Sequence, residues 1–244
     1  MSEDSKKASS ARQVAVVTGA ARGIGKALLD ELLQRNYMVI AVVKQLDDVQ
    51  ILDSIDPKSV FTIRADITEN STEKVLQDFL NNTVEKIDLL INNAGFSAKG
   101  KGIEGLSFLE LDAVVSVHCH GPARCVRASL PFLRKSKNPV ILNISSRFGS
   151  TELVVTEAVP NEVTTYPYRI AKSSMNMLTA CLAVELRPEN IRVLAVHPGA
   201  VKTSFAAKDA DVEPEQAAKN IIDLAEKGTD TGTFAHASGG TLPW

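Results

Sequence analysis

The sequence has few of the residues that hold disulfide scaffolds or metal centres together. Its 244 residues include three cysteines and four histidines. Cys119, Cys125 and Cys181 form an odd, scattered set, which indicates free thiols in a reducing compartment. The histidines show no spacing typical of a zinc site. The sequence therefore predicts a fold that needs neither disulfides nor a metal.

A strong excess of one charge is also absent, as are long apolar stretches. The chain carries 27 basic and 29 acidic residues, and its formal net charge is -2. This balance disfavours nucleic-acid binding. No apolar stretch reaches the roughly 18 residues of a membrane span, and the polar segment 1–12 does not resemble a signal peptide. We expect a cytoplasmic protein with a disordered leader over 1–12 and with no nucleic-acid or membrane partner.

Short apolar runs alternate with amphipathic stretches along the rest of the chain. The runs predict strands at 13–18, 38–43, 60–64, 87–91, 140–144 and 191–196, with a weak strand at 232–235. The amphipathic stretches predict helices at 26–35, 69–82, 108–135, 167–186 and 214–227. Because the strands are continuously apolar, they favour a parallel sheet with helices on both faces. We predict one α/β domain over 13–244, a doubly wound Rossmann-type sheet.

A glycine-rich turn follows the first predicted strand and precedes the first predicted helix. Its glycines have the spacing G-x-x-x-G-x-G. Glycines allow the backbone to approach a pyrophosphate closely, and the helix N-terminus offers free N–H groups. Three glycines are a weak signal by themselves, and a tight turn without a ligand is the alternative. We predict that a dinucleotide binds here, in contact with Gly19, Arg22, Gly23, Ile24 and Gly25.

The residues after the second strand bear on the choice of dinucleotide. An acidic residue there would favour NAD, whereas a cation would favour the 2′-phosphate of NADP. The chain has Lys44 at this position and no acid before Asp47. Lys44 and Arg22 would together neutralise a 2′-phosphate, although each is equally explained as a solvated surface cation. The sequence favours NADP(H).

Further motifs follow in a fixed order along the chain. They are Asn92-Asn93-Ala94-Gly95, Ser145-Ser146, the Y-x-x-x-K pattern of Tyr168 to Lys172, Pro198-Gly199 and Val201-Lys202-Thr203. In this set the chain resembles the short-chain dehydrogenase/reductase family over residues 13 to about 204. The segments 146–150, 168–169 and 242–244 are most similar to the sniffer and C-factor-like carbonyl reductases. Some fungal polyketide ketoreductases belong to the same neighbourhood.

The Y-x-x-x-K pattern places Tyr168 and Lys172 on one helix face. A phenol ionises near pH 10, and a nearby ammonium would lower its pKa toward the working range. The resemblance implies that Tyr168 gives a proton to a carbonyl oxygen that Ser146 holds, as hydride leaves the nicotinamide. It also implies that Lys172 holds the nicotinamide ribose and that Ser145 makes only strand-end hydrogen bonds. Without this context, the Tyr/Lys pair would be a helix-surface contact.

The resemblance assigns other residues to the cofactor. Asp66 is expected to bind the adenine, although a helix-capping role explains it nearly as well. The remaining expected contacts are Asn92, Asn93, Ala94 and Gly95 on the adenosine side, Pro198 and Gly199 after the sixth strand, and Val201 and Thr203 at the carboxamide. A homodimer or homotetramer is expected to form through the helices predicted at 108–135 and 167–186. Core packing is the better single explanation for their apolar residues, such as Met175, Met177, Leu178 and Leu182.

The chain departs from the family at His118. Relatives carry an asparagine there, which completes a proton relay to the active-site lysine. Histidine, with a pKa near 6.5, would be able to relay protons. The alternative is a space-filling residue that makes a hydrogen bond to the backbone. The interval of 22 residues from Ser146 to Tyr168 predicts a loop near the substrate over 151–165. The short polar segment 204–213 predicts an open site for a bulky or flat substrate.

These observations lead to one main hypothesis and two alternatives. We expect an NADP(H)-dependent reductase of a ketone or aldehyde, with a bulky or polyketide-like substrate compatible with the site. The first alternative is a non-redox isomerase, dehydratase or cyclase that retains the nucleotide, a hypothesis motivated by His118. The second is a nucleotide sensor without turnover. Ser146, Tyr168 and Lys172 argue against the sensor, because a sensor needs no such set.

Overall fold

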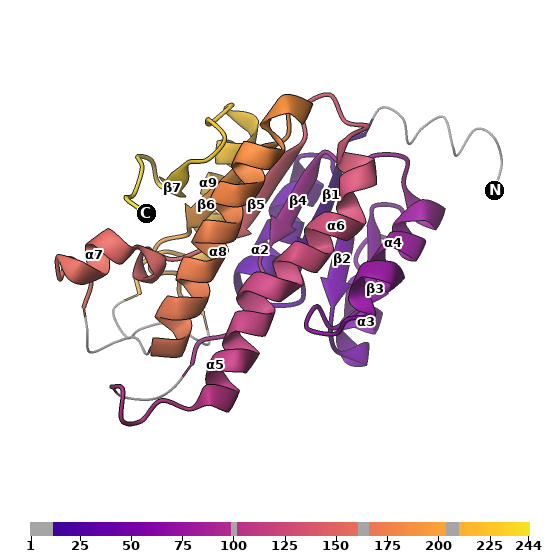
Figure 1. Cartoon of the computed structure of the whole chain (residues 1–244). Coiled ribbons are helices and arrows are strands. Elements are labelled where there is room, and N and C mark those ends of the chain that lie inside the picture. The colour runs from indigo at the N-terminus through magenta and orange to yellow at the C-terminus, as the bar shows by residue number, and fades with distance from the viewer. Residues whose placement is uncertain (1–11, 99–101, 161–165, 204–209) are drawn as a thin grey trace.

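The strands assemble into one parallel sheet in the computed structural model, which describes residues 12–98, 102–160, 166–203 and 210–244 (Figure 1). Its seven strands have the order β3-β2-β1-β4-β5-β6-β7. Their bounds are β1 Val14–Thr18, β2 Met38–Val43, β3 Val60–Arg64, β4 Leu89–Asn92, β5 Val140–Ile144, β6 Arg192–His197 and β7 Phe234–His236. The predicted doubly wound sheet is confirmed.

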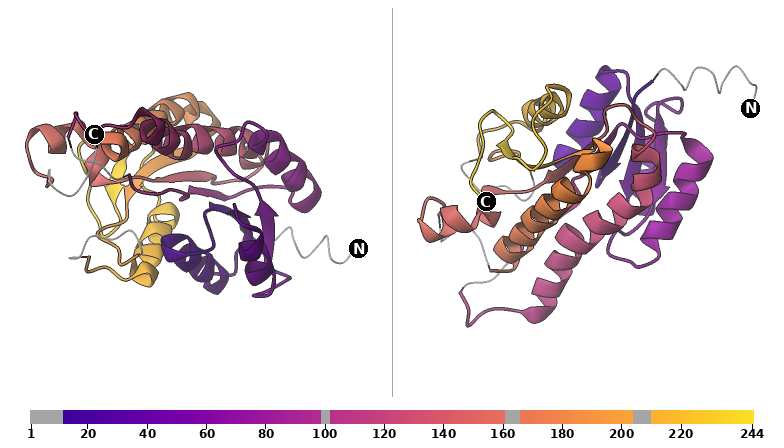
Figure 2. Two further views of the ribbon diagram at one scale, coloured as in Figure 1. Left: turned by 90° about the horizontal axis from the view of Figure 1, so that it is seen from below. Right: turned by 45° about the horizontal axis from the view of Figure 1, so that its top comes forward.

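Helices cover both faces of the sheet, as the view from below in Figure 2 shows. On one face lie α2 Gly23–Gln34, α3 Leu46–Asp53 and α9 Pro214–Glu226, which share a buried apolar cluster. On the other lie α4 Thr72–Thr83, α5 Phe108–Val115, α6 Gly121–Leu133 and α8 Tyr166–Glu185. Successive strand residues alternate between the clusters, so Val16 packs under α4 and α6 while Val17 packs under α2. Burial on both faces explains why the strands are continuously apolar.

Helix α3 was not predicted from the sequence, and helix α2 begins earlier than predicted. Helix α3 has Asp47 and Asp48 in its first turn, while Leu46 and Ile51 are exposed and only Leu52 is buried. This composition leaves almost no apolar periodicity to detect. Helix α2 begins at Gly23 rather than Lys26, because the last part of the glycine turn is already helical.

The long helix predicted at 108–135 is interrupted in its middle. Between α5 and α6 the residues Ser116–His120 form a π-helical turn. Such turns insert an extra residue into a helix and occur often at functional sites. Here the turn contains His118, the position at which the family resemblance predicts an asparagine. Periodicity alone does not reveal the turn, because the segment remains helical on both sides.

The segment between β5 and α8, which contains the loop predicted over 151–165, is more ordered than expected. Arg147–Gly149 form a 3-10 turn, and Thr151–Val155 form the short helix α7. Residues 161–165, and with them the end of the predicted substrate loop, lie outside the described residues. Arg12, assigned above to a disordered leader, donates from Nε to the Asn36 carbonyl oxygen at 2.8 Å. Within the described ranges, the structure contains no helix that is both long and apolar enough to cross a bilayer.

Candidate active site

The candidate site begins where β1 and β4 lie side by side. The chain moves outward from these strands in opposite directions, and open α/β sheets bind ligands at the carboxyl ends of such a pair. Backbone N–H groups of Asn93 and Ala94 donate to Thr18 Oγ1 at 3.0 and 3.1 Å. The Asn93 amide donates to the carbonyl oxygens of Thr18 and Gly19 at 2.9 and 3.2 Å. The segment after β4 therefore braces the glycine turn after β1.

The glycine turn has no room for side chains at two of its positions. A Cβ on Gly25 would lie 2.0 Å from the Gly19 carbonyl oxygen, and one on Gly19 would lie 2.9 Å from Ala94 Cα. Gly19 also has a φ of +67°, a conformation that favours glycine. The first residue of α2 follows Arg22, whose extended backbone provides no side-chain cap. The uncapped N–H groups and the bare backbone fit the pyrophosphate of a dinucleotide.

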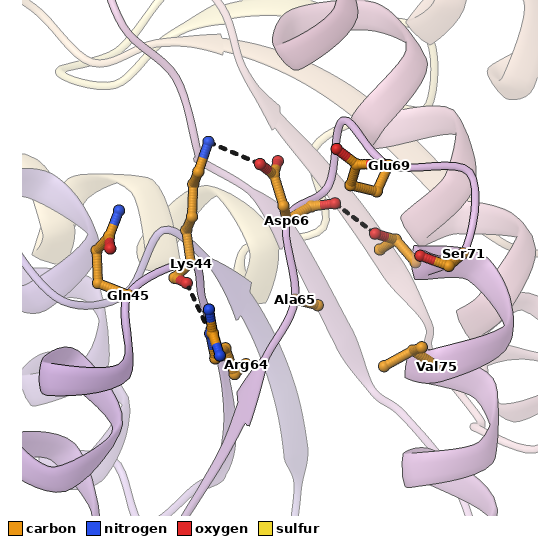
Figure 3. A pocket seen from close by; sticks show the side chains of 9 residues that line it. Lys44, Gln45, Arg64, Ala65, Asp66, Glu69, Ser71 and Val75 are labelled. Atoms are coloured by element: carbon orange, nitrogen blue, oxygen red, sulfur yellow. Dashed lines mark hydrogen bonds and ion pairs between the residues drawn. The ribbon is translucent and has the colours of Figure 1, made fainter.

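A cavity of about 350 Å³ lies at the carboxyl ends of β2 and β3 (Figure 3). In it Lys44 Nζ lies 2.6 Å from Asp66 Oδ2, and the lysine side chain is 65% exposed. Burial acts to raise the pKa of Asp66, but hydrogen bonds from Lys44 and Thr68 hold it below its usual value. Lys44 and Asp66, predicted to bind different parts of the adenosine, are thus brought into direct contact.

Arg64 is a cavity residue that the sequence analysis missed. It is the last residue of β3 and is the register partner of Val43, directly before Lys44. Its Nε donates to the Lys44 carbonyl oxygen at 3.3 Å, and it lines the same cavity (Figure 3). The available signal was a basic residue at the end of the strand that follows Lys44. That signal requires knowing that β2 and β3 are neighbours.

The structure brings together the three side chains predicted to act on a substrate. Tyr168 and Lys172 lie on α8, and Ser146 follows β5. Tyr168 shares a hydrogen bond with Ser146. Lys172 Nζ donates to the Ile144 carbonyl oxygen at 2.6 Å and lies 5.6 Å from the Tyr168 ring centroid. The phenol and the serine hydroxyl therefore face one another, with the lysine buried behind them.

The charges of this group differ from the sequence expectation. Burial raises the pKa of Tyr168 to about 12, and the hydrogen bond with Ser146 only partly opposes this. Burial also lowers the pKa of Lys172 to about 7, so its ammonium is a weak source of charge at neutral pH. The expected lowering of the Tyr168 pKa by Lys172 is not found, because desolvation disfavours both charged forms. Tyr168 is protonated at neutral pH and suited to donate a proton.

His118 lies next to Tyr168, with the two rings edge to face and their centroids 5.7 Å apart. The side chain is 2% exposed, and Nε2 lies 2.9 Å from the Phe96 carbonyl oxygen. Burial, and then the charge of Lys172, hold the pKa of His118 well below its usual value. The imidazole is therefore neutral at pH 7, with its proton on Nε2. The pKa near 6.5 on which the relay hypothesis relied does not hold in this environment.

The second imidazole nitrogen of His118 is available as an acceptor. Nδ1 is buried and has no hydrogen-bond partner among the residues that the structure describes. A buried acceptor without a partner is costly, which favours a water or a substrate hydroxyl at this position. The role of His118 in a proton relay stays a prediction. It is limited to that of a neutral imidazole whose Nδ1 accepts a hydrogen bond.

We expect Gly95→Ala to lower the free energy of unfolding by about 1–3 kcal/mol, because it overpacks a buried site. A Cβ on Gly95 would lie 2.2 Å from Cε1 of the buried His118 ring. Urea denaturation measures the loss. The shorter side chain of His118→Asn removes the clashing atom, so Gly95→Ala should cost less in that background. Equal costs in both backgrounds would show that this contact is not the cause.

A buried polar network holds the strand ends against α8. Ser145 Oγ donates to Asn176 Oδ1 at 2.5 Å, and Asn176 Nδ2 donates to the Gly149 carbonyl oxygen at 3.1 Å. These contacts agree with the expectation that Ser145 makes only strand-end hydrogen bonds. Asn176, one helical turn after Lys172, is a positioning residue that the sequence analysis missed. A polar residue on the inward face of α8 was the available signal.

Asn92 belongs to the same buried layer rather than to the surface of the cleft. It is 1% exposed, and its amide donates to Asn143 Oδ1 at 2.8 Å. Asn143 in turn donates to Thr179 Oγ1 at 2.8 Å. The side chain of Asn92, predicted to line the adenosine side, thus ties β4 to β5. It lies inside because it is the last residue of a strand buried on both faces.

The segment after β6 returns toward the glycine turn. Gly199 has a φ of +94°, and Val201 pairs with Val212 in an isolated bridge. A Cβ on Gly23 would lie 3.4 Å from Thr203 Cγ2, so Thr203 lies beside the phosphate-binding turn. Residues 204–209, most of the predicted open segment, lie outside the described residues.

Comparisons with known proteins agree with this geometry. The family model for short chain dehydrogenases matches residues 13–214. The C-signal protein of Myxococcus xanthus is 27% identical over 160 residues, which cover 65% of this chain and 93% of that protein. A crystal structure of NADPH-bound carbonyl reductase from chicken fatty liver is 25% identical, with a TM-score of 0.82 and coverage of 96% and 99% of the two chains.

A second solved structure shows the same fold. The carbonyl reductase Sniffer of D. melanogaster has a TM-score of 0.83 and 24% identity, and the match covers 96% of this chain and all (100%) of that one. The predicted resemblance is thereby confirmed. With its parallel sheet, glycine turn and ordered motifs, the chain belongs to the short-chain dehydrogenase/reductase family of oxidoreductases.

Proposed function

We propose that the protein reduces a ketone or aldehyde carbonyl to an alcohol and uses NADPH as its cofactor. The observation that carries this proposal is the Tyr168 hydroxyl on α8, which shares a hydrogen bond with Ser146 at the end of β5. A phenol whose pKa is raised to about 12 holds its proton until a stronger base forms nearby. A carbonyl oxygen becomes such a base as it is reduced.

The residues divide the work at the carbonyl oxygen. Bound NADPH supplies a hydride to the carbonyl carbon. Ser146 Oγ hydrogen-bonds the carbonyl oxygen and holds it in line with Tyr168. The Tyr168 hydroxyl then donates its proton to that oxygen. Lys172, which donates to the Ile144 carbonyl oxygen behind the phenol, would hold the hydroxyls of the nicotinamide ribose.

The preference for NADPH rests on the cavity at the ends of β2 and β3. Lys44 and Arg64 line it, and Arg22 leaves the glycine turn as an exposed cation. These residues supply positive charge where a 2′-phosphate would lie. The acidic residues among those that line the cavity are Asp66 and Glu69. The carbonyl reductase from chicken liver, whose structure holds NADPH, supports the same assignment. Asp66 is then released from Lys44 to bind the adenine.

We expect Lys44→Ala to raise the KM for NADPH by about tenfold, since it removes a charge-assisted hydrogen bond to the 2′-phosphate. The KM for NADH should change by less than about threefold. Steady-state kinetics with both cofactors measure the two values. Lys74→Ala removes another exposed lysine paired with a carboxylate and is the matched control. An unchanged preference in Lys44→Ala would contradict the assignment of this residue.

The reaction itself is tested by following NADPH absorbance with a panel of aliphatic, aromatic and polyketide-like carbonyl compounds. Consumption of NADPH with formation of the alcohol supports the proposal. Conversion of a substrate without consumption of NADPH would instead support an isomerase, dehydratase or cyclase. The neutral, buried His118 is the feature that would serve such a non-redox reaction, because its Nδ1 is able to accept a hydrogen bond from a substrate.

Self-association is a further part of the proposal. Apolar side chains remain exposed on the two neighbouring helices α5 and α8, namely Phe108, Leu109, Met177 and Val184. A second copy that packs these helices against its own would remove this apolar surface from water. We propose a homodimer of this kind, or a homotetramer that contains it.

A further inference from the structure

Three basic side chains meet at the carboxyl ends of the last three strands of the sheet. His197 ends β6, and His236 ends β7 as its register partner. Their rings lie edge to face with centroids 5.0 Å apart. Arg147 opens the 3-10 turn after β5, directly after Ser146. Three neighbouring strands thus deliver a guanidinium and two imidazoles to one edge of the sheet.

These groups have unused hydrogen-bonding capacity. The guanidinium of Arg147, 5.6 Å from the Phe148 ring centroid, makes no hydrogen bond or ion pair with any residue of the described ranges. His197 is 7% exposed, and its Nδ1 is buried with no partner in the same part of the chain. His236 Nδ1 accepts from the Ser238 N–H at 3.2 Å, which leaves the proton of the neutral ring on Nε2. His236 Nε2 is therefore a donor.

The electrostatics of the cluster lack a counter-charge. Burial, then the electrostatic influence of His236, Arg147 and Lys172, lower the pKa of His197 to about 3. Burial and then Arg147 also lower the pKa of His236. Among the described residues no carboxylate opposes either shift. The guanidinium of Arg147 is the charged member of this cluster at neutral pH. An anion beside it would supply its counter-charge and accept hydrogen bonds from the guanidinium and the imidazole N–H groups.

We infer that Arg147, His197 and His236 form a binding site for an oxyanion, a carboxylate or a phosphate group, beside Ser146. The pyrophosphate of the cofactor is not its occupant. The phosphate-binding turn follows β1, and β6 is three strands away, which at about 4.8 Å per strand is roughly 14 Å. The occupant is either the acidic group of the carbonyl substrate or a free anion. The inference that the substrate supplies the anion rests on the proposed function, whereas the inference that these residues bind an anion does not.

Binding is tested without turnover, on the full chain, by NMR of the histidine ring protons. The chain has four histidines, so the signals can be assigned by substitution. Benzoate and inorganic phosphate are the probes. We expect saturable shifts of the His197 and His236 signals in the native protein, weakened at least tenfold in Arg147→Met. Arg127→Met, which removes an exposed arginine on α6, is the matched control and should bind as the native protein does. Absence of saturable shifts in the native protein would overturn the site.

Kinetics distinguish the two sources of the anion. The substrate pair is 4-carboxybenzaldehyde and 4-carbamoylbenzaldehyde, which differ in charge but hardly in size. If the site takes the substrate, the ratio of kcat/KM for the acid over the amide is about 10 to 100 and falls at least tenfold in Arg147→Met. If Arg147→Met leaves this ratio unchanged while the native protein shows the benzoate-induced NMR shifts, the substrate is rejected as the source of the anion. That outcome would support binding of a free anion. If no compound of the carbonyl panel, these two aldehydes included, consumes NADPH, the proposed function fails, while the NMR result still decides the site.

Discussion

Tyr168→Phe is expected to lower kcat for carbonyl reduction by about 10²- to 10⁴-fold, the range that a positioned general acid contributes. The substitution removes one oxygen and leaves the ring that packs against His118. It removes the hydrogen bond between the phenol and Ser146, and with it the general acid that faces the carbonyl oxygen. Steady-state rates of NADPH oxidation measure the loss. NADPH binding, followed by fluorescence titration, should weaken by less than about tenfold, because Lys172 and the glycine turn remain.

The control for this substitution is on the same helix. Tyr166→Phe removes the hydroxyl of a neighbouring tyrosine that is 46% exposed, and it should retain the native rate. A Tyr168→Phe protein that keeps more than about a tenth of the native kcat would show that another group supplies the proton. His118 is not a candidate for that role at neutral pH, since burial and the charge of Lys172 keep its ring neutral.

Gly25→Ala is expected to weaken NADPH binding by more than about 100-fold. The added methyl group would lie 2.0 Å from the Gly19 carbonyl oxygen and 2.6 Å from Asn93 Nδ2. Backbone, not a flexible side chain, has to move to admit it. The shift breaks the brace between Asn93 and Gly19 and displaces the N–H groups that would hold the pyrophosphate. Fluorescence or calorimetric titration with NADPH measures the loss.

Loss of binding must be separated from loss of folding. The unfolding transition of Gly25→Ala in urea shows whether the domain remains cooperative. Gly228→Ala is the matched control, because that glycine has a φ of +77° with nothing within 4 Å of an added Cβ. It should lower stability through backbone strain and leave NADPH affinity unchanged. Native affinity in a folded Gly25→Ala protein would refute the assignment of the turn to the pyrophosphate.

The strands and the order of the motifs were predictable because they depend on local pattern. A strand buried on both faces must be apolar throughout, so 38–43 and 60–64 were recognisable with their observed bounds. The exposed helix α3 was not recognisable, because it buries one leucine and has no apolar stripe. The π-helical turn was hidden for a different reason. It changes the hydrogen bonding of a helix without changing its composition.

The partners of charged residues were less predictable than their positions. Lys44 and Arg22 were identified from the sequence as cations for a 2′-phosphate. The ion pair between Lys44 and Asp66, and the place of Arg64 beside them, depend on the pairing of β2 with β3. The same holds for Arg147, His197 and His236, which are 50 and 39 residues apart along the chain and meet because β5, β6 and β7 are neighbours.

The sequence by itself determined the fold class, the glycine turn and the set of Ser146, Tyr168 and Lys172, because strand burial and motif spacing are local properties. Only the tertiary structure decided the protonation of that set. The pKa of Tyr168 is raised to about 12, the pKa of Lys172 is lowered to about 7 and His118 is kept neutral. Each shift arises mainly from desolvation by segments distant in sequence, and no local pattern records how deeply a side chain will be buried.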